Sequence, residues 1–112
     1  MIAAALVSIL LAAPATTCGA TDDYGKALCS YQRRNFAEAE AEFKAIVEKD
    51  KDEPDATTIR AVYFLARTEM KLGRFEDAET LFIRIYSMSK AFYDEWQCDF
   101  LLGECRKARG EA

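Results

Sequence analysis

The chain has 112 residues, of which 51% are hydrophobic and 30% are charged, and its formal net charge is −4 at pH 7. This length allows one domain, and the balance of apolar and charged residues is typical of a globular protein. Histidine is absent, which excludes catalysis by Ser-His or Cys-His pairs. Basic residues do not cluster beyond Arg33 and Arg34, so we expect no nucleic-acid partner.

The N-terminal segment predicts an export leader. Residues 1–20 carry no charge, and residues 2–13 are almost uniformly apolar. A bilayer-spanning helix needs about 20 apolar residues, so this run is too short to span and has the length of a signal-peptide core. Small residues at 13–15 or 18–20 fit a cleavage site, and Cys18 stands where a lipidated cysteine would lie.

The chain is therefore expected to be exported behind a signal peptide or a lipoprotein-type leader. In a bacterium it would be periplasmic or associated with the cell envelope, and in any other organism it would be secretory. Membrane contact is expected only through the leader or through a lipid anchor on Cys18. A disordered apolar tail is the alternative interpretation of residues 1–20.

Beyond the leader, apolar residues recur at three- and four-residue steps, which indicates amphipathic helices. Few glycines and prolines interrupt the pattern, so the fold class is expected to be all-α. Gly73 stands where a left-handed residue ends one helix and turns into the next, and Arg34 with Asn35 holds the corresponding place earlier. Pro54 fits the first turn of a helix after a charged connector. The expected helices lie at about residues 22–34, 37–49, 55–72, 75–88 and 91–109.

One unit of sequence occurs twice. At an offset of 39 the matched pairs are Ala27 and Ala66, Phe36 and Phe75, Ala39 and Ala78, Phe43 and Phe82, and Ile46 and Ile85. A further offset of 37 places Leu65 on Leu102 and begins a third unit that stops halfway. We expect one domain at residues 21–112, with units at about 22–54 and 55–90 and a half-unit at 91–112.

These residues resemble the tetratricopeptide repeat (TPR) family. The resemblance is carried by Leu65 and Ala66 in a first helix, the run from Gly73 to Phe75, and Ala78 and Phe82 in a second helix. It covers about residues 22–110, and residues 92–96 and 101–105 are similar to helix openings in small exported bacterial cell-envelope TPR proteins. The resemblance implies a short α-solenoid of antiparallel helix hairpins: two TPR units and a C-terminal capping helix.

In this family the first helices of the units line a concave groove that receives a peptide or a partner's helix. The resemblance therefore implies a non-enzymatic protein–protein interaction module, an extracytoplasmic adaptor or scaffold. Transferred position by position, the groove residues are Tyr24, Leu28, Tyr31, Tyr63, Arg67, Met70, Lys71, Phe100 and Glu104. In this mapping Tyr24, Tyr63 and Phe100 form an aromatic column, and Arg60, Arg67 and Lys71 are available to an acidic ligand. The alternative is that the rings pack on neighbouring helices.

No catalytic or metal site is expected. The sequence has no nucleophile–base pair, metal-ligand cluster or phosphate-binding Gly loop, so we expect neither enzymatic activity nor a cofactor. Cys98 and Cys105 lie seven residues apart on one expected helix, about 10.5 Å by helical rise and beyond the ~7 Å that a disulfide tolerates. Cys29 belongs to a distant unit. We expect buried thiols at all three, with a disulfide, including one between chains, as the alternative.

The incomplete third unit leaves a second function open. Trp96, Phe100, Leu101 and Leu102 lie on a helix whose partner helix is missing from the repeat. That helix either caps the stack or docks its exposed side on another copy of the chain. A structural or self-associating envelope element with no separate ligand is therefore the alternative function.

Overall fold

A computed structural model describes residues 18–110, so the first 17 residues of the predicted leader lie outside the described part. No strand occurs within these residues, and the predicted all-α class is confirmed. None of the helices found there is long and apolar enough to cross a bilayer. The helices are α2 (Asp23–Gln32), α3 (Phe36–Lys49), α4 (Ala56–Lys71), α5 (Phe75–Met88), α6 (Lys90–Glu95) and α7 (Cys98–Ala108).

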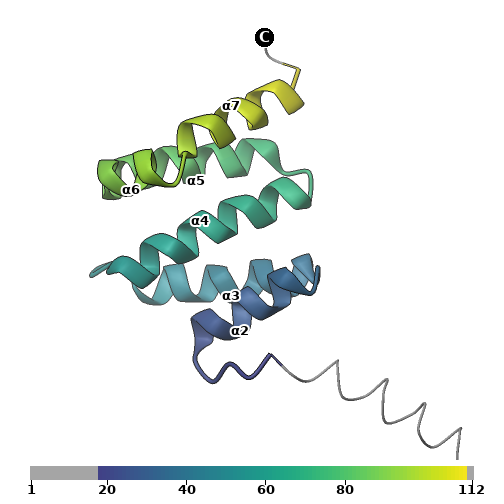
Figure 1. The fold of residues 1–112 in the computed structure, drawn as a ribbon, viewed down its shortest axis with the longest axis vertical. Coiled ribbons are helices and arrows are strands. Elements are labelled where there is room, and N and C mark those ends of the chain that lie inside the picture. The colour runs from purple at the N-terminus through teal and green to yellow at the C-terminus, as the bar shows by residue number, and fades with distance from the viewer. Residues whose placement is uncertain (1–17, 111–112) are drawn as a thin grey trace, which may run out of the picture.

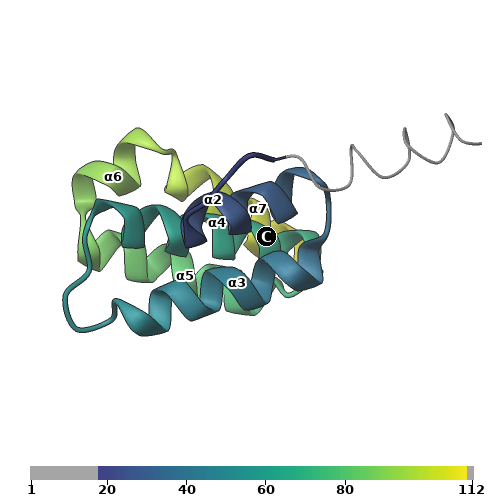
Figure 2. The ribbon, with the colours of Figure 1, turned by 90° about the horizontal axis from the view of Figure 1, so that it is seen from below.

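Helices that follow one another in the chain pack side by side. α2 contacts α3, α3 contacts α4, α4 contacts α5, and α5 contacts both α6 and α7, so that the helices rise in order from α2 to α7 (Figure 1). Seen along the long axis, α3 and α5 lie on one side, and α2, α4 and α6 lie on the other (Figure 2). α2 also contacts α4 directly. The molecule therefore presents two different sides, one formed by α3 and α5 and the other by α2, α4 and α6.

Residues matched by the sequence repeat occupy matched places in the core. Four alanines with no exposed surface lie where neighbouring helices approach closely, and two fully buried phenylalanines fill the space around them. The small side chains bring the helix axes together, and the two rings are the largest fully buried side chains. The alanines are Ala27, Ala39, Ala66 and Ala78, and the rings are those of Phe43 and Phe82.

The turns inside the two hairpins also match. Arg34 and Gly73 both have a left-handed backbone, with φ of 66° and 80°. Asn35 N donates to the carbonyl oxygen of Ser30, and Arg74 N donates to that of Glu69, at 2.8 Å in each case. Both are Schellman-type helix ends, as expected for Gly73, and the first turn forces a non-glycine residue into the same conformation.

α4 begins one residue later than the proline pattern suggests. Asp55 caps the helix by accepting from Thr58 N at 2.9 Å, and Thr58 Oγ1 accepts from Asp55 N at 3.1 Å. Thr58 Oγ1 also donates to Asp50 at 3.1 Å and so ties the connector to the helix. Pro54 therefore precedes the cap and is not in the first turn, because the Asp–Thr capping box fixes the start.

The prediction of a single helix at 91–109 is wrong, because the structure has two helices there, α6 and α7. Ser89 caps α6 by accepting from Phe92 N at 3.1 Å, and α6 ends before Gln97, which has a left-handed φ of 55°. The break turns Trp96 back onto Tyr63 of α4, with ring centroids 4.9 Å apart. Burial of this ring against α4 offsets the backbone strain at Gln97.

Ion pairs link successive hairpins at matched positions. Glu40 on α3 pairs with Arg74 in the turn between α4 and α5. The matched residue Glu79 on α5 pairs with Arg106 at 3.4 Å and with Arg109, both at the C-terminal end of α7. Because Glu79 is 8% exposed, these pairs are screened less than surface pairs and hold α7 against α5.

Candidate functional site

The predicted groove residues do not form one continuous surface. Those on α2 are half-buried, those on α7 are exposed, and those on α4 differ in burial. On α4, Arg67 and Met70 are half-buried and Lys71 is exposed, whereas Tyr63 is only 6% exposed. The residues on α2 are Tyr24, Leu28 and Tyr31, and those on α7 are Phe100 and Glu104.

Tyr63 is a core residue and not a groove residue. Its ring contacts Trp96 at 4.9 Å, Phe92 at 6.0 Å and Phe82 at 6.2 Å between centroids. Only its hydroxyl oxygen reaches a polar group, accepting from Arg67 Nη1 at 3.0 Å. The expected aromatic column through Tyr63 is therefore not a surface that a ligand meets, and packing on neighbouring helices prevails for this ring.

Phe64, the next residue, lies at the centre of the ring cluster between α2 and α4. Its ring centroid is 5.5 Å from that of Tyr31, 6.5 Å from that of Tyr24 and 6.4 Å from that of Trp96. The side chain is half-buried, so part of it remains accessible. Sequence reasoning missed this residue, because one step along a helix rotates the side chain by about 100° and the adjacent Tyr63 matched the family pattern.

A stripe of basic and aromatic side chains runs along α4. We call it the basic–aromatic face and define it by Arg60, Phe64, Arg67 and Lys71, at the i, i+4, i+7, i+11 spacing of one helix side. The half-buried Tyr24 and Tyr31 of α2 flank Phe64. The signal that identifies it in the sequence is the position of these four residues opposite the buried Ala61, Val62, Leu65 and Ala66.

Each arginine of this face lies beside a tyrosine of α2. Arg67 donates to the Tyr63 hydroxyl group and also interacts with that of Tyr31. Arg60 acts electrostatically on Tyr24: burial raises the pKa of Tyr24, and the Arg60 charge opposes that rise. A carboxylate placed here would meet a guanidinium group with a phenol beside it, and both donate hydrogen bonds.

The cations of this face have no carboxylate partner. Within residues 18–110, neither Arg60, Arg67 nor Lys71 forms a salt bridge, although Asp and Glu outnumber Lys and Arg by 19 to 15 in the chain. Other basic residues, Arg74 among them, are paired with carboxylates. The positive charge of the basic–aromatic face is thus available to a ligand.

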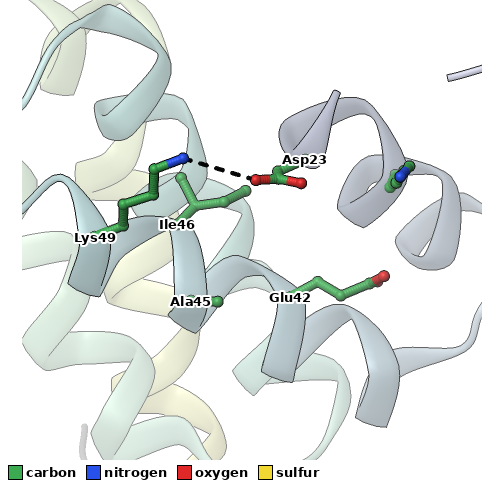
Figure 3. A pocket seen from close by; sticks show the side chains of 6 residues that line it. Asp23, Glu42, Ala45, Ile46 and Lys49 are labelled. Atoms are coloured by element: carbon green, nitrogen blue, oxygen red, sulfur yellow. Dashed lines mark ion pairs between the residues drawn. The ribbon is translucent and has the colours of Figure 1, made fainter. Parts of the chain in front are cut away.

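A separate hollow of about 210 Å³ lies between α2 and α3 (Figure 3). Asp23 and Lys49 point toward one another across it, 3.9 Å apart, with Ile46 beside them. Glu42, which also lines it, accepts a hydrogen bond from Ser30 Oγ at 2.6 Å. Among the four charged side chains that line it, Asp23, Lys49 and Glu42 already have partners and Lys26 has none within the described residues, so this hollow is less suited to a charged ligand than the face on α4.

The cysteines differ from the expectation at one position. Cys29 forms a disulfide with Cys18, with 5.8 Å between the Cα atoms, so the expected thiol at Cys29 is wrong. Cys98 and Cys105 are free and fully buried, as expected. Burial raises the pKa of each thiol to about 11, which leaves little reactive thiolate at neutral pH. A Cys18 sulfur atom in this disulfide cannot also carry a lipid, so lipidation of Cys18 and the disulfide exclude one another.

Among residues 18–110 there is no group of three or more His, Cys, Asp or Glu side chains placed to hold a metal ion. In comparisons with known proteins, the chain matches no family model, no curated protein and no solved structure.

Proposed function

We propose that this chain is a non-enzymatic interaction module of the TPR type that holds a segment of a partner protein, a peptide or a helix, against the basic–aromatic face. The observation that carries the proposal is the combination on α4 of three cations without a carboxylate partner and the half-buried ring of Phe64. The few residues that contribute most of the binding energy in protein interfaces are enriched in tryptophan, tyrosine and arginine.

Three matched features support the TPR-type arrangement. The left-handed turn recurs at Arg34 and Gly73, and the Glu–Arg link recurs at Glu40 and Glu79. The buried alanines and phenylalanines recur at the offset found in the sequence. Repeated local contacts of this kind stack hairpins into a slab, because each unit buries its apolar side against the next.

The N-terminal part of the chain supports a scaffold that acts outside the cytoplasm. The uncharged apolar start predicts export, and the Cys18–Cys29 disulfide is chemistry that persists in oxidising compartments. The disulfide also requires that Cys18 remain in the mature protein, which favours cleavage near Ala15 over cleavage after Ala20.

Affinity capture with a charge-matched control tests this proposal. Immobilised protein beginning at Cys18 is incubated with an envelope fraction, beside an Arg60→Ala, Arg67→Ala variant and a Lys26→Ala, Arg84→Ala variant. Lys26 lies on the side of α2 that faces the hollow, and Arg84 is exposed on α5, so the control removes equal charge elsewhere. We expect a captured protein that the first variant loses and the second retains. Equal capture by all three would remove the basic–aromatic face from the proposal.

A second candidate is self-association, favoured by exposed apolar side chains at the C-terminal end of the stack. Phe100 on α7 is 62% exposed, and Ile83 and Tyr86 on α5 are about half exposed. The apolar side expected on the last helix is otherwise largely covered, since Leu102 is buried and Trp96 packs on α4. Sedimentation velocity over a wide concentration range tests it: a dimer that a Phe100→Ser, Tyr86→Ser variant abolishes would favour it, and a monomer throughout would exclude it.

A further inference from the structure

We propose that the segment bound by the basic–aromatic face is acidic and carries an apolar side chain between its carboxylates. This inference rests on the proposed function and specifies the partner that the face accepts. It follows from the charges, spacing and burial of the four residues that define the face.

The spacing of the face sets the spacing of the ligand. With a helical rise of about 1.5 Å per residue, Arg60 and Arg67 are separated by about 10 Å along α4, and Lys71 lies about 6 Å further on. Phe64 stands between the two arginines and is flanked by Tyr24 and Tyr31. A segment that meets both arginines therefore places its carboxylates about 10 Å apart, with an apolar side chain between them over Phe64.

Charge complementarity selects an acidic partner. Arg67 is half-buried and its guanidinium group lies over the Tyr63 ring, 5.8 Å from the centroid, so water screens its charge less than that of a fully exposed arginine. Within residues 18–110 its guanidinium group donates a hydrogen bond to a neutral hydroxyl oxygen, that of Tyr63 at 3.0 Å, and forms no salt bridge with a carboxylate. A carboxylate supplies the opposite charge in the planar geometry that a guanidinium group binds with two hydrogen bonds.

The same features disfavour a nucleic acid. A nucleic-acid backbone presents phosphates at every step and needs a basic surface of matching extent, whereas this face has three cations on a chain of net charge −4. The Phe64 ring at the centre of the face offers contact area to an apolar side chain. A protein segment with a few carboxylates matches both parts of the surface.

Selection from a random peptide library tests the inference without a known partner. Twelve-residue peptides displayed on phage are selected on immobilised protein beginning at Cys18, and the retained sequences are compared with the input library. We expect Asp and Glu to be enriched several-fold, with an apolar residue between them. Enrichment of neutral or basic peptides would overturn the acidic partner and leave the proposed function standing, whereas no enrichment of any peptide would count against both.

Charge reversal then places the bound peptide on α4. A selected peptide is labelled, and its affinity is measured by fluorescence anisotropy for the native sequence and for two variants. The Arg60→Glu, Arg67→Glu variant is expected to bind at least about tenfold more weakly. The Lys26→Glu, Arg84→Glu variant, with the same change in net charge, is expected to bind within about twofold of the native protein. Equal weakening by both variants would overturn the site.

Two further measurements separate recognition from general attraction of anions. Added salt is expected to weaken binding of the peptide, because it screens exposed cations such as Arg60 and Lys71. A DNA dodecamer used as competitor is expected not to displace it, and full displacement at equal concentration would show an unspecific anion site and overturn the inference. Circular dichroism of each variant establishes that helicity is retained, and a variant that has lost it is replaced by the corresponding Arg→Gln pair.

Discussion

The carboxyl groups of Glu40 on α3 and Glu69 on α4 form a hydrogen-bonded pair beside Arg74. The Glu69 side chain is 3% exposed, and burial together with Glu40 raises its pKa to about 7. The hydrogen bond from Glu69, assisted by Arg74, lowers the pKa of Glu40 to about 2. Between these values the pair holds one proton and one negative charge, which faces the Arg74 guanidinium group.

This pair predicts an unusual dependence of stability on pH. The folded protein binds the Glu69 proton more tightly than the unfolded chain, whose glutamates titrate near 4.5. The contribution of Glu69 to the free energy of unfolding is therefore complete below pH 4.5 and is lost as pH rises toward 7, by about 1–3 kcal/mol. Glu40 has the opposite sign: its contribution is present above pH 4.5 and is lost as pH falls toward 2.

Glu69→Gln isolates the upper part of this profile. The amide donates to Glu40 as the protonated carboxyl group does, but it does not titrate. We expect the free energy of unfolding of the variant, measured with urea, to fall less between pH 4.5 and 7 than that of the native protein. Glu38→Gln, which changes an exposed glutamate on α3, is the control. An unchanged slope in the Glu69 variant would contradict the shared proton.

The two left-handed turns predict substitutions of opposite effect. At Arg34 a side chain adopts a conformation that costs about 1–2 kcal/mol relative to glycine, so Arg34→Gly is expected to stabilise the protein by up to about 1 kcal/mol. The gain is reduced by loss of the contact between Arg34 and the Phe36 ring, 5.5 Å from its centroid. At Gly73 an added Cβ meets no atom within 4 Å, so Gly73→Ala should cost about 1 kcal/mol for backbone reasons alone. Thermal unfolding of both variants checks the signs.

The cysteine pairing predicts a thiol count. In protein that retains Cys18, titration under denaturing, non-reducing conditions should find two free thiols, at Cys98 and Cys105, and a peptide map should link Cys18 to Cys29. In the folded protein the same two thiols should react slowly, because they are buried and their pKa is about 11. A diacylglycerol on Cys18 with a free thiol at Cys29 would establish the lipoprotein alternative instead.

The two aromatic residues of the last segment should differ sharply in their effect on stability. Trp96 contacts Tyr63, Phe64 and Phe92, whereas Phe100 is 62% exposed and has no ring contact within residues 18–110. Trp96→Ala is expected to cost about 2–4 kcal/mol and Phe100→Ala less than about 0.5 kcal/mol. Equal costs would mean that α6 is not held against α4. Urea unfolding is followed by circular dichroism, because Trp96 is the only tryptophan and its replacement removes the tryptophan fluorescence signal.

Local patterns in the sequence were sufficient to predict the first four helices and the turn at Gly73. Apolar periodicity placed the first four helices within two residues, because each has one buried side, and α2 and α4 are each followed by a left-handed residue. The break at Gln97 had no such signal: neither glycine nor proline marks it, and only the packing of Trp96 on α4 explains it.

The candidate site was harder to predict, because it depends on helix rotation and on contacts distant in sequence. Val62, Tyr63 and Phe64 are consecutive apolar residues, so periodicity does not decide which of them faces the core. The structure buries Tyr63 and leaves Phe64 half-buried. Cys18 lies in the predicted leader, where a cleavage site or a lipid anchor is expected, so no local pattern indicates its pairing with Cys29, 11 residues away.

Burial of Cys98 and Cys105 has a consequence for the route by which the chain reaches its native disulfide. One bridge among four thiols can form in six ways, and the docking of α7 on α5 buries Cys98 and Cys105 and so removes the five ways that involve either of them. Oxidation before that docking permits scrambled products, while oxidation afterwards leaves one choice. The order of these two events, set by how quickly α7 docks relative to the local oxidant, therefore decides the yield of correctly bridged protein.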